Sequence, residues 1–370
     1  MNIFYTTVLC GFIAAMSTHF VAADTEQQSA TAFGQQLQLS STPWHKKLMY
    51  IAAISHEEEN LSGRLSDRDS NSGLYVSTFN MDTTTKSPAI SLRASGNLFK
   101  NTSLHLGITS KQIDSRSSVP LAIGALPGSS SLGGGSMQLH GDGNSLGLDM
   151  SLAYQATPLM SLIFDLYLDD YDIAFVDSYS ASYTSGLTIS GNDQYDFSGT
   201  VSGLNITARI DNKINKTKFS SAYSFGHSRN RYTDGGIDSG NRNNIPFQDT
   251  YNDEYSEREK THLLNASADH YFAYNFSAGI FLKVASVKVN DGYSEKSNTI
   301  AARVKYLLTQ NILVVLNYEK YLKYKSGFFN EELDFDAVSL TISYNLSNKT
   351  SKRRIRKSRL MGSNRFSNVL

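Results

Sequence analysis

Cysteine and long apolar segments are almost absent from this chain. Cys10 is the single cysteine among 370 residues, so no disulfide framework holds the fold together. Beyond the first 23 residues, no segment approaches the ~20 apolar residues that a membrane-spanning helix needs. The composition therefore excludes both a disulfide-stapled extracellular domain and a helical membrane protein.

The first 23 residues are apolar and end in small side chains. Val21-Ala22-Ala23 stands directly before Asp24, and small residues at such a place suit a signal peptidase. The basic residues that usually precede the apolar run are missing. We expect residues 1–23 to be a signal peptide that directs export and is then cleaved, which leaves the mature chain without cysteine.

The chain also lacks an overall excess of charge, because 34 basic residues balance 34 acidic ones. Residues 349–365 nevertheless hold eight basic residues and no acidic one, so the rest of the chain carries a net charge of about −8. We expect residues 348–370 to form a basic tail. It either meets anionic lipid or another polyanion of the envelope, or is simply a solubilising tail. We expect no nucleic acid partner.

What the sequence does contain is alternation of apolar and polar residues. In Val338–Leu346, every second residue is apolar and the residues between are Ser, Thr or Asn; residues 145–154 repeat the pattern. Successive side chains of a strand point to opposite sides, so each such segment has one apolar and one polar face. We expect strands near residues 73–80, 89–98, 103–111, 145–154, 159–168, 197–210, 217–226, 262–271, 276–287, 299–308, 312–322 and 337–346.

The connections between these strands alternate in length. Tight connections lie near residues 99–102, 155–158, 211–216, 272–275 and 309–311; long polar ones span 112–144, 169–196, 228–259, 290–298 and 323–335. Short periplasmic turns opposite long external loops are typical of outer-membrane barrels, whereas a soluble sandwich has no reason to keep this order.

We therefore predict an all-β protein, an antiparallel up-and-down transmembrane β-barrel of about 12 strands over residues 73–347. Residues 24–72 are expected to be a periplasmic or plug-like segment. Residues 47–55 also read as a strand, which breaks the even parity of bacterial barrels and leaves 14 strands as the alternative.

Charged residues on the polar faces are expected to point into the barrel, since Arg or Lys facing lipid costs about 2–4 kcal/mol at mid-membrane. The predicted interior-facing charges are Asp149, Asp165, Arg209, Asp269, Lys283, Arg303, Lys305 and Glu319. Their mixed signs argue against strong ion selectivity, and whether the interior conducts stays open.

Motifs for catalysis and metal binding are incomplete. Gly143-Asn144-Ser145-Leu146-Gly147 matches Gly-x-Ser-x-Gly, but a Gly-rich segment precedes it and an alternating strand follows, where a nucleophile elbow needs a strand and then a helix. Residues 67–73 lack the spacing of a calcium loop, and His56 lacks a second histidine. We expect no cofactor, no metal and no enzyme, with an envelope-lipid hydrolase using Ser145 as the least favoured alternative.

The hairpin near the C-terminus carries a family resemblance. Leu308-Thr309-Gln310-Asn311 joins two alternating segments, and the second ends with Ser343-Tyr344-Asn345-Leu346. This resembles the terminal hairpin of outer-membrane β-barrel porins, some of them linked to exopolysaccharide export, in which the last strand ends in an aromatic residue that the barrel-assembly machinery recognises. Leu346 stands at that place here. The resemblance implies a barrel in the cell outer membrane and transfers no functional residue.

Three functions follow as hypotheses. The first is a porin-like passive channel for small hydrophilic solutes or saccharides. The second is a non-conducting structural barrel associated with surface polysaccharide, and the third is the hydrolase. The expected partners are outer-membrane lipid, the assembly machinery and lipopolysaccharide. The acidic segment 228–259 either lies among the lipopolysaccharide headgroups or is a solvated loop.

Overall fold

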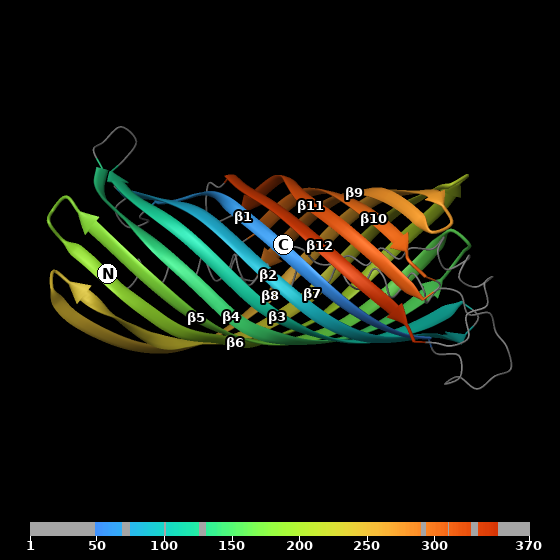
Figure 1. The fold of residues 1–370 in the computed structure, drawn as a ribbon, viewed down its shortest axis with the longest axis horizontal. Coiled ribbons are helices and arrows are strands. Elements are labelled where there is room, and N and C mark those ends of the chain that lie inside the picture. The colour runs from blue at the N-terminus through green and yellow to red at the C-terminus, as the bar shows by residue number, and fades with distance from the viewer. Residues whose placement is uncertain are drawn as a thin grey trace.

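A computed structural model describes residues 49–68, 75–99, 101–125, 131–289, 294–309, 311–326 and 332–346. These residues form a closed antiparallel barrel in which each strand pairs with its neighbours in sequence and β1 pairs with β12 (Figure 1). The strands are β1 (Met49–Arg68), β2 (Tyr75–Phe99), β3 (Thr102–Ala125), β4 (Ser131–Gln155), β5 (Met160–Tyr183), β6 (Thr188–Ile214), β7 (Thr217–Arg242), β8 (Ile245–Ala273), β9 (Phe276–Val289), β10 (Ser294–Leu307), β11 (Ile312–Ser326) and β12 (Glu332–Asn345).

The predicted fold class and strand number are confirmed, but the predicted start of the barrel and the division of one strand into two were wrong. The segment 47–55 is part of β1, so the barrel begins at Met49 and not at residue 73. The expected strands 73–80 and 89–98 are one strand, β2, which keeps the total at twelve. The signal peptide, the basic tail and the rest of the N-terminal segment lie outside the described residues. None of the described residues forms a helix long and apolar enough to cross a bilayer.

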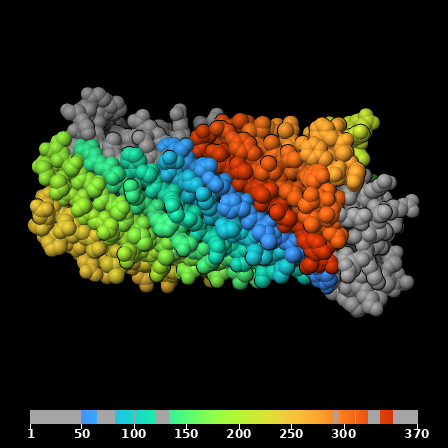
Figure 2. Space-filling view, in the orientation of Figure 1, coloured from blue at the N-terminus to red at the C-terminus, as the bar shows by residue number. Residues whose placement is uncertain are grey.

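The barrel wall is continuous where the two ends of the chain meet. β1 and β12 pair from Ile51–Asn345 to Arg64–Glu332, and Figure 2 shows them side by side. The start of β1 and the end of β12 both lie at the end of the barrel that carries the tight turns, on the right of Figure 1. This is the arrangement that an even number of strands produces.

The long connections predicted from the sequence are mostly strand. Strands β2 to β8 are 24 to 29 residues long and β9 to β12 only 14 or 15, whereas about 9–11 residues cross a bilayer. The acidic segment 228–259, for example, is not a loop but the paired halves of β7 and β8, joined at Asn243 and Asn244. β2 to β8 therefore project well beyond the membrane at the hairpin-tip end.

The faces of the wall exchange polarity where the strands leave the membrane. On β5 the outward residues Phe164, Leu166 and Leu168 are apolar and exposed. Further along the strand the outward residues are Asp170 and Asp172, while the inward residues become apolar and buried. Only the half nearest the tight turns thus has an apolar outer surface, which we call the membrane band. The projecting half has the polar outside and apolar inside of a water-exposed sheet.

The projecting part is open on one side. Pairing between β8 and β9 begins at Glu259, opposite Val289. Among the described residues, 245–258 therefore pair with β7 alone. An unpaired strand edge invites association with other strands. Here the edge carries Pro246, Asp249, Asp253 and Glu254, and proline and charged residues are known to protect such edges.

Candidate functional site: the inner face of the barrel

The inner face of the membrane band carries ion pairs between strands that are not direct neighbours. Lys283 on β9 lies 2.7 Å from Glu319 on β11, and Arg303 on β10 lies 3.1 Å from Asp269 on β8. Gly279 of β9 pairs with both Asp269 and Arg303. A Cβ atom at Gly279 would overlap the Asp269 carboxylate, so the missing side chain allows this ion pair to form across β9.

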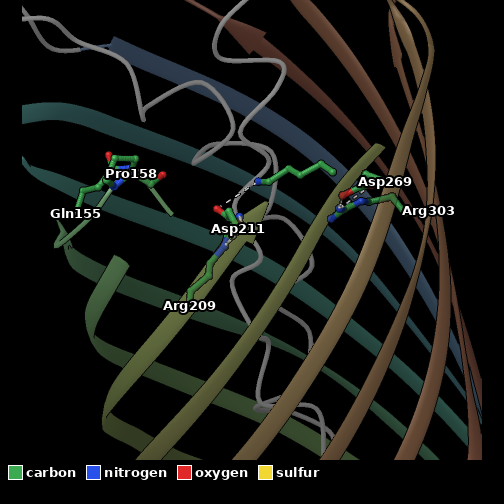
Figure 3. Close-up of polar contacts among 7 residues, drawn as sticks. Gln155, Pro158, Arg209, Asp211, Asp269 and Arg303 are labelled. Carbon is green, nitrogen blue, oxygen red and sulfur yellow. Dashed lines mark hydrogen bonds and ion pairs between the residues drawn. The ribbon is translucent and has the colours of Figure 1, made fainter. Parts of the chain in front are cut away.

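A second charged group lies beside the Asp269–Arg303 pair, since Lys218 is the direct cross-strand partner of Asp269 (Figure 3). Arg209 on β6 donates two hydrogen-bonding contacts to Asp211, through Nε at 2.9 Å and Nη2 at 2.8 Å. Lys218 on β7 lies 3.5 Å from the other oxygen of Asp211. Buried charges are stable only when paired in this way.

The structure places all eight predicted charges on the inner side of the wall, where the alternation puts buried or half-buried residues. It brings Asp269 together with Arg303, and Lys283 with Glu319. Arg209 pairs with Asp211, which was not predicted. The remaining three are partly buried; Asp165 accepts a hydrogen bond from Ser151 at 2.5 Å, and Asp149 and Lys305 face inward elsewhere on the wall.

Sequence analysis missed a cluster of aromatic and aliphatic side chains on the inner face of the projecting half. Phe175 stacks on Tyr195 with ring centroids 5.1 Å apart, and Tyr232 stacks on Tyr255 at 5.0 Å. The Phe175 ring occupies the space that a Cβ atom on Gly141 of the neighbouring strand would need. The ring thus lies against the wall rather than across the barrel.

Four inward carboxylates border these rings: Asp177 on β5, Asp193 on β6, and Asp234 and Asp238 on β7. Burial, and then repulsion from Asp193, raises the pKa of Asp177 to about 8. Burial likewise raises the pKa of Asp193 to about 6 and that of Asp234 to about 6. The signal for these residues was present as Asp and Tyr at every second position, but it lay in segments assigned to loops.

The motif residues considered for catalysis occupy strand positions. Ser145 lies within β4, in register with Lys111 and Tyr171, and the strand continues on both sides of it. The strand-turn-helix geometry of a nucleophile elbow is therefore absent at this serine. His105 faces inward on β3, with its Nε2 3.2 Å from Ser103 Oγ. In the described ranges, no group of three or more His, Cys, Asp or Glu residues is arranged to hold a metal ion.

Comparisons with known proteins point to the fold alone. No family model and no curated protein matches the chain. Among solved structures, it is similar to the translocator domain of the autotransporter NalP from Neisseria meningitidis, with a TM-score of 0.52 at 9% identity over 90% of this chain and 97% of that one.

Two further solved structures show weaker likeness. The transport unit of the autotransporter AIDA-I from Escherichia coli matches with a TM-score of 0.48 at 12% identity, over 86% of this chain and 97% of that one. A FadL homologue from Pseudomonas aeruginosa matches with a TM-score of 0.39 at 10% identity, over 80% and 90%. The closed 12-strand architecture and the likeness to NalP identify the chain as having the fold of a Gram-negative outer-membrane β-barrel.

Proposed function

We propose that the barrel is a passive channel for small hydrophilic solutes, saccharides among them. The observation that carries the proposal is the chemistry of the inner face within the membrane band. On β12 this face presents Ser339, Thr341, Ser343 and Asn345, and the ion pairs described above lie on the adjacent strands β8 to β11. A solute that leaves water finds hydrogen-bonding partners along such a wall.

The side chains on the inner face of the projecting half favour saccharides as the solutes. This face combines stacked rings such as Phe175 and Tyr195 with carboxylates such as Asp193 and Asp238. The C–H faces of a sugar ring pack against aromatic rings while its hydroxyl groups donate hydrogen bonds to carboxylates, the usual mixture of apolar contacts and a few placed polar groups in a ligand site.

Single-channel conductance of the refolded full chain in a planar bilayer tests the proposal. We expect discrete openings whose conductance falls in Thr207→Trp, because Thr207 faces inward on β6. Ile206→Trp is the matched control, since the adjacent Ile206 faces outward and is 39% exposed; its conductance should equal that of the unmodified protein. No openings, or equal conductance in both variants, would contradict a channel.

A second candidate is a non-conducting structural barrel associated with surface polysaccharide. The observation in its favour is that Arg209 and Arg303 are 0% and 1% exposed, so the inner charges pair with each other rather than face an open passage. This candidate predicts silent bilayers for every variant, together with reduced retention of surface polysaccharide on deletion of the gene. Unchanged retention would contradict it.

A further inference from the structure

Four carboxylates, those of Asp177, Asp193, Asp234 and Asp238, lie close together on the projecting half, and none of them forms an ion pair with a Lys or Arg of the described ranges. Asp177 and Asp193 are direct cross-strand partners, and Asp193 is also the partner of Asp238. Like charges in such positions repel one another. Burial raises the pKa of Asp238, and the positive charge of Arg242 lowers it, but Arg242 forms no ion pair with Asp238.

Hydrogen bonding inside the barrel satisfies only part of the group. Tyr251 donates to both oxygens of Asp193, at 3.0 and 3.2 Å, and Tyr179 donates to Asp238 at 2.6 Å. Asp177 Oδ1 and Asp234 Oδ1 are buried and have no hydrogen-bond partner within the structure described. These two side chains are 2% and 5% exposed.

A third polar group in the same place also lacks a partner. The hydroxyl of Tyr195, a residue 3% exposed, makes no hydrogen bond in the described part of the chain. Its charge interactions are with Asp177, Asp193, Asp234 and Tyr251, which places it beside the carboxylates. Leaving a buried polar atom unpaired costs roughly 1–3 kcal/mol. Three such atoms in one place indicate a ligand that supplies the missing partners.

The arrangement of the carboxylates favours an organic cation over a metal ion. They do not converge in the way that a metal site of three or more acidic or histidine ligands requires. Instead they are interleaved with rings: Phe175 stacks on Tyr195, and Phe197 contacts Phe175 at 6.5 Å between centroids. Ring faces attract cations, most strongly where water is excluded.

We propose that Asp177, Asp193, Asp234 and Asp238 with Phe175 and Tyr195, which we call the acidic–aromatic patch, bind small organic cations that carry an ammonium or guanidinium group on an apolar body. The charged group lies between Asp177 and Asp234 and the apolar body packs on the rings. Because the patch lies toward the hairpin tips, at the left of Figure 1, it enriches such cations at the outer mouth; that role in selection rests on the proposed channel function.

Isothermal titration calorimetry on the refolded full chain in detergent at pH 8.5 tests the binding. Benzylamine is the probe, and benzyl alcohol is its neutral counterpart of nearly the same shape. We expect benzylamine to bind at least tenfold more tightly. Equal binding of the two, or preferential binding of Mg²⁺ at the patch, would overturn the proposal, and this comparison needs no variant.

Two double variants locate the site. Asp177→Asn with Asp234→Asn should weaken benzylamine binding at least tenfold, whereas Asp170→Asn with Asp172→Asn, on the outer face, should leave it unchanged. Heat-modifiable migration on a gel checks that both fold. Unchanged binding in the inner variant would overturn the proposal. So would displacement of benzylamine by a peptide of residues 349–365 that binds more tightly, because the patch would then be a site for the chain's own basic tail.

The two proposals fail in distinguishable ways. A protein that binds benzylamine but never conducts refutes the channel and keeps the binding site. A protein that conducts without binding benzylamine refutes the site and keeps the channel.

Discussion

The outer face of β4, like that of β5, is apolar near the tight turn and polar further along. One substitution should therefore be costly at the first height and nearly neutral at the second. Leu148 faces outward, is 46% exposed, and lies about midway between the turn after Gln155 and Asn144, the first outward polar residue beyond the band. Arg at such a depth costs about 2–4 kcal/mol. Leu148→Arg should therefore lower the folding equilibrium constant roughly 30- to 700-fold, since each 1.4 kcal/mol is tenfold.

Gln138→Arg is the matched control on the same strand. Gln138 is exposed on the outer face of the projecting half, where an exposed substitution usually changes stability by no more than about 0.5 kcal/mol. The assay is denaturant titration in lipid vesicles, with the folded fraction read from heat-modifiable migration. If Leu148→Arg and Gln138→Arg proved equally stable, or if the unmodified chain stayed soluble and monomeric without detergent, the membrane band would be misplaced.

Three further predictions concern the inner face. Lys283→Met should cost about 3–5 kcal/mol by leaving the buried Glu319 carboxylate unpaired, and Lys283→Met with Glu319→Leu should recover most of it in the same titration; a double variant as unstable as the single one contradicts this. The raised pKa values of Asp177, Asp193 and Asp234 (about 8, 6 and 6) mean that the folded state holds protons which the unfolded chain releases near pH 4. Their contribution is therefore present below pH 4 and lost as the pH rises to about 8, so β5–β7 amides should exchange hydrogen faster at pH 8.5 than at pH 5 after correction for intrinsic rates, less so in Asp177→Asn; the reverse trend contradicts it. Gly279→Val should cost about 1–3 kcal/mol, because its side chain collides with the Asp269 carboxylate, whereas Ala278→Val, pointing the other way, should change unfolding little; equal costs would remove the role given to Gly279.

The strand β5 explains how far sequence reasoning reached. Residues 159–168 were predicted as strand because Phe164, Leu166 and Leu168 alternate with polar residues. From Tyr171 to Tyr179 the alternation continues, but its apolar members shift from even to odd positions as the outer face passes from lipid to water. A search for one unbroken apolar face ends at this shift, so the projecting half was assigned to loops.

The prediction for the charges rested on a different rule. A charge that faces lipid is costly, so Asp269 and Arg303 are both expected to face inward. The alternation of the strand then assigns every second residue to the same inner face. Their pairing was beyond reach, because Arg303 and Asp269 are 34 residues apart. The meeting depends on the register of three strands and on the missing side chain of Gly279.

The pairing of β1 with β12 has a consequence for assembly. Every other pair joins strands that follow each other in the chain, so each forms as a local hairpin, whereas Ile51 and Asn345 meet only after almost the whole polypeptide has been laid down. Closing so long a segment is entropically costly and slow. The β1–β12 pair therefore closes the barrel last, and a chain truncated before Glu332 would remain an open sheet with two unpaired edge strands.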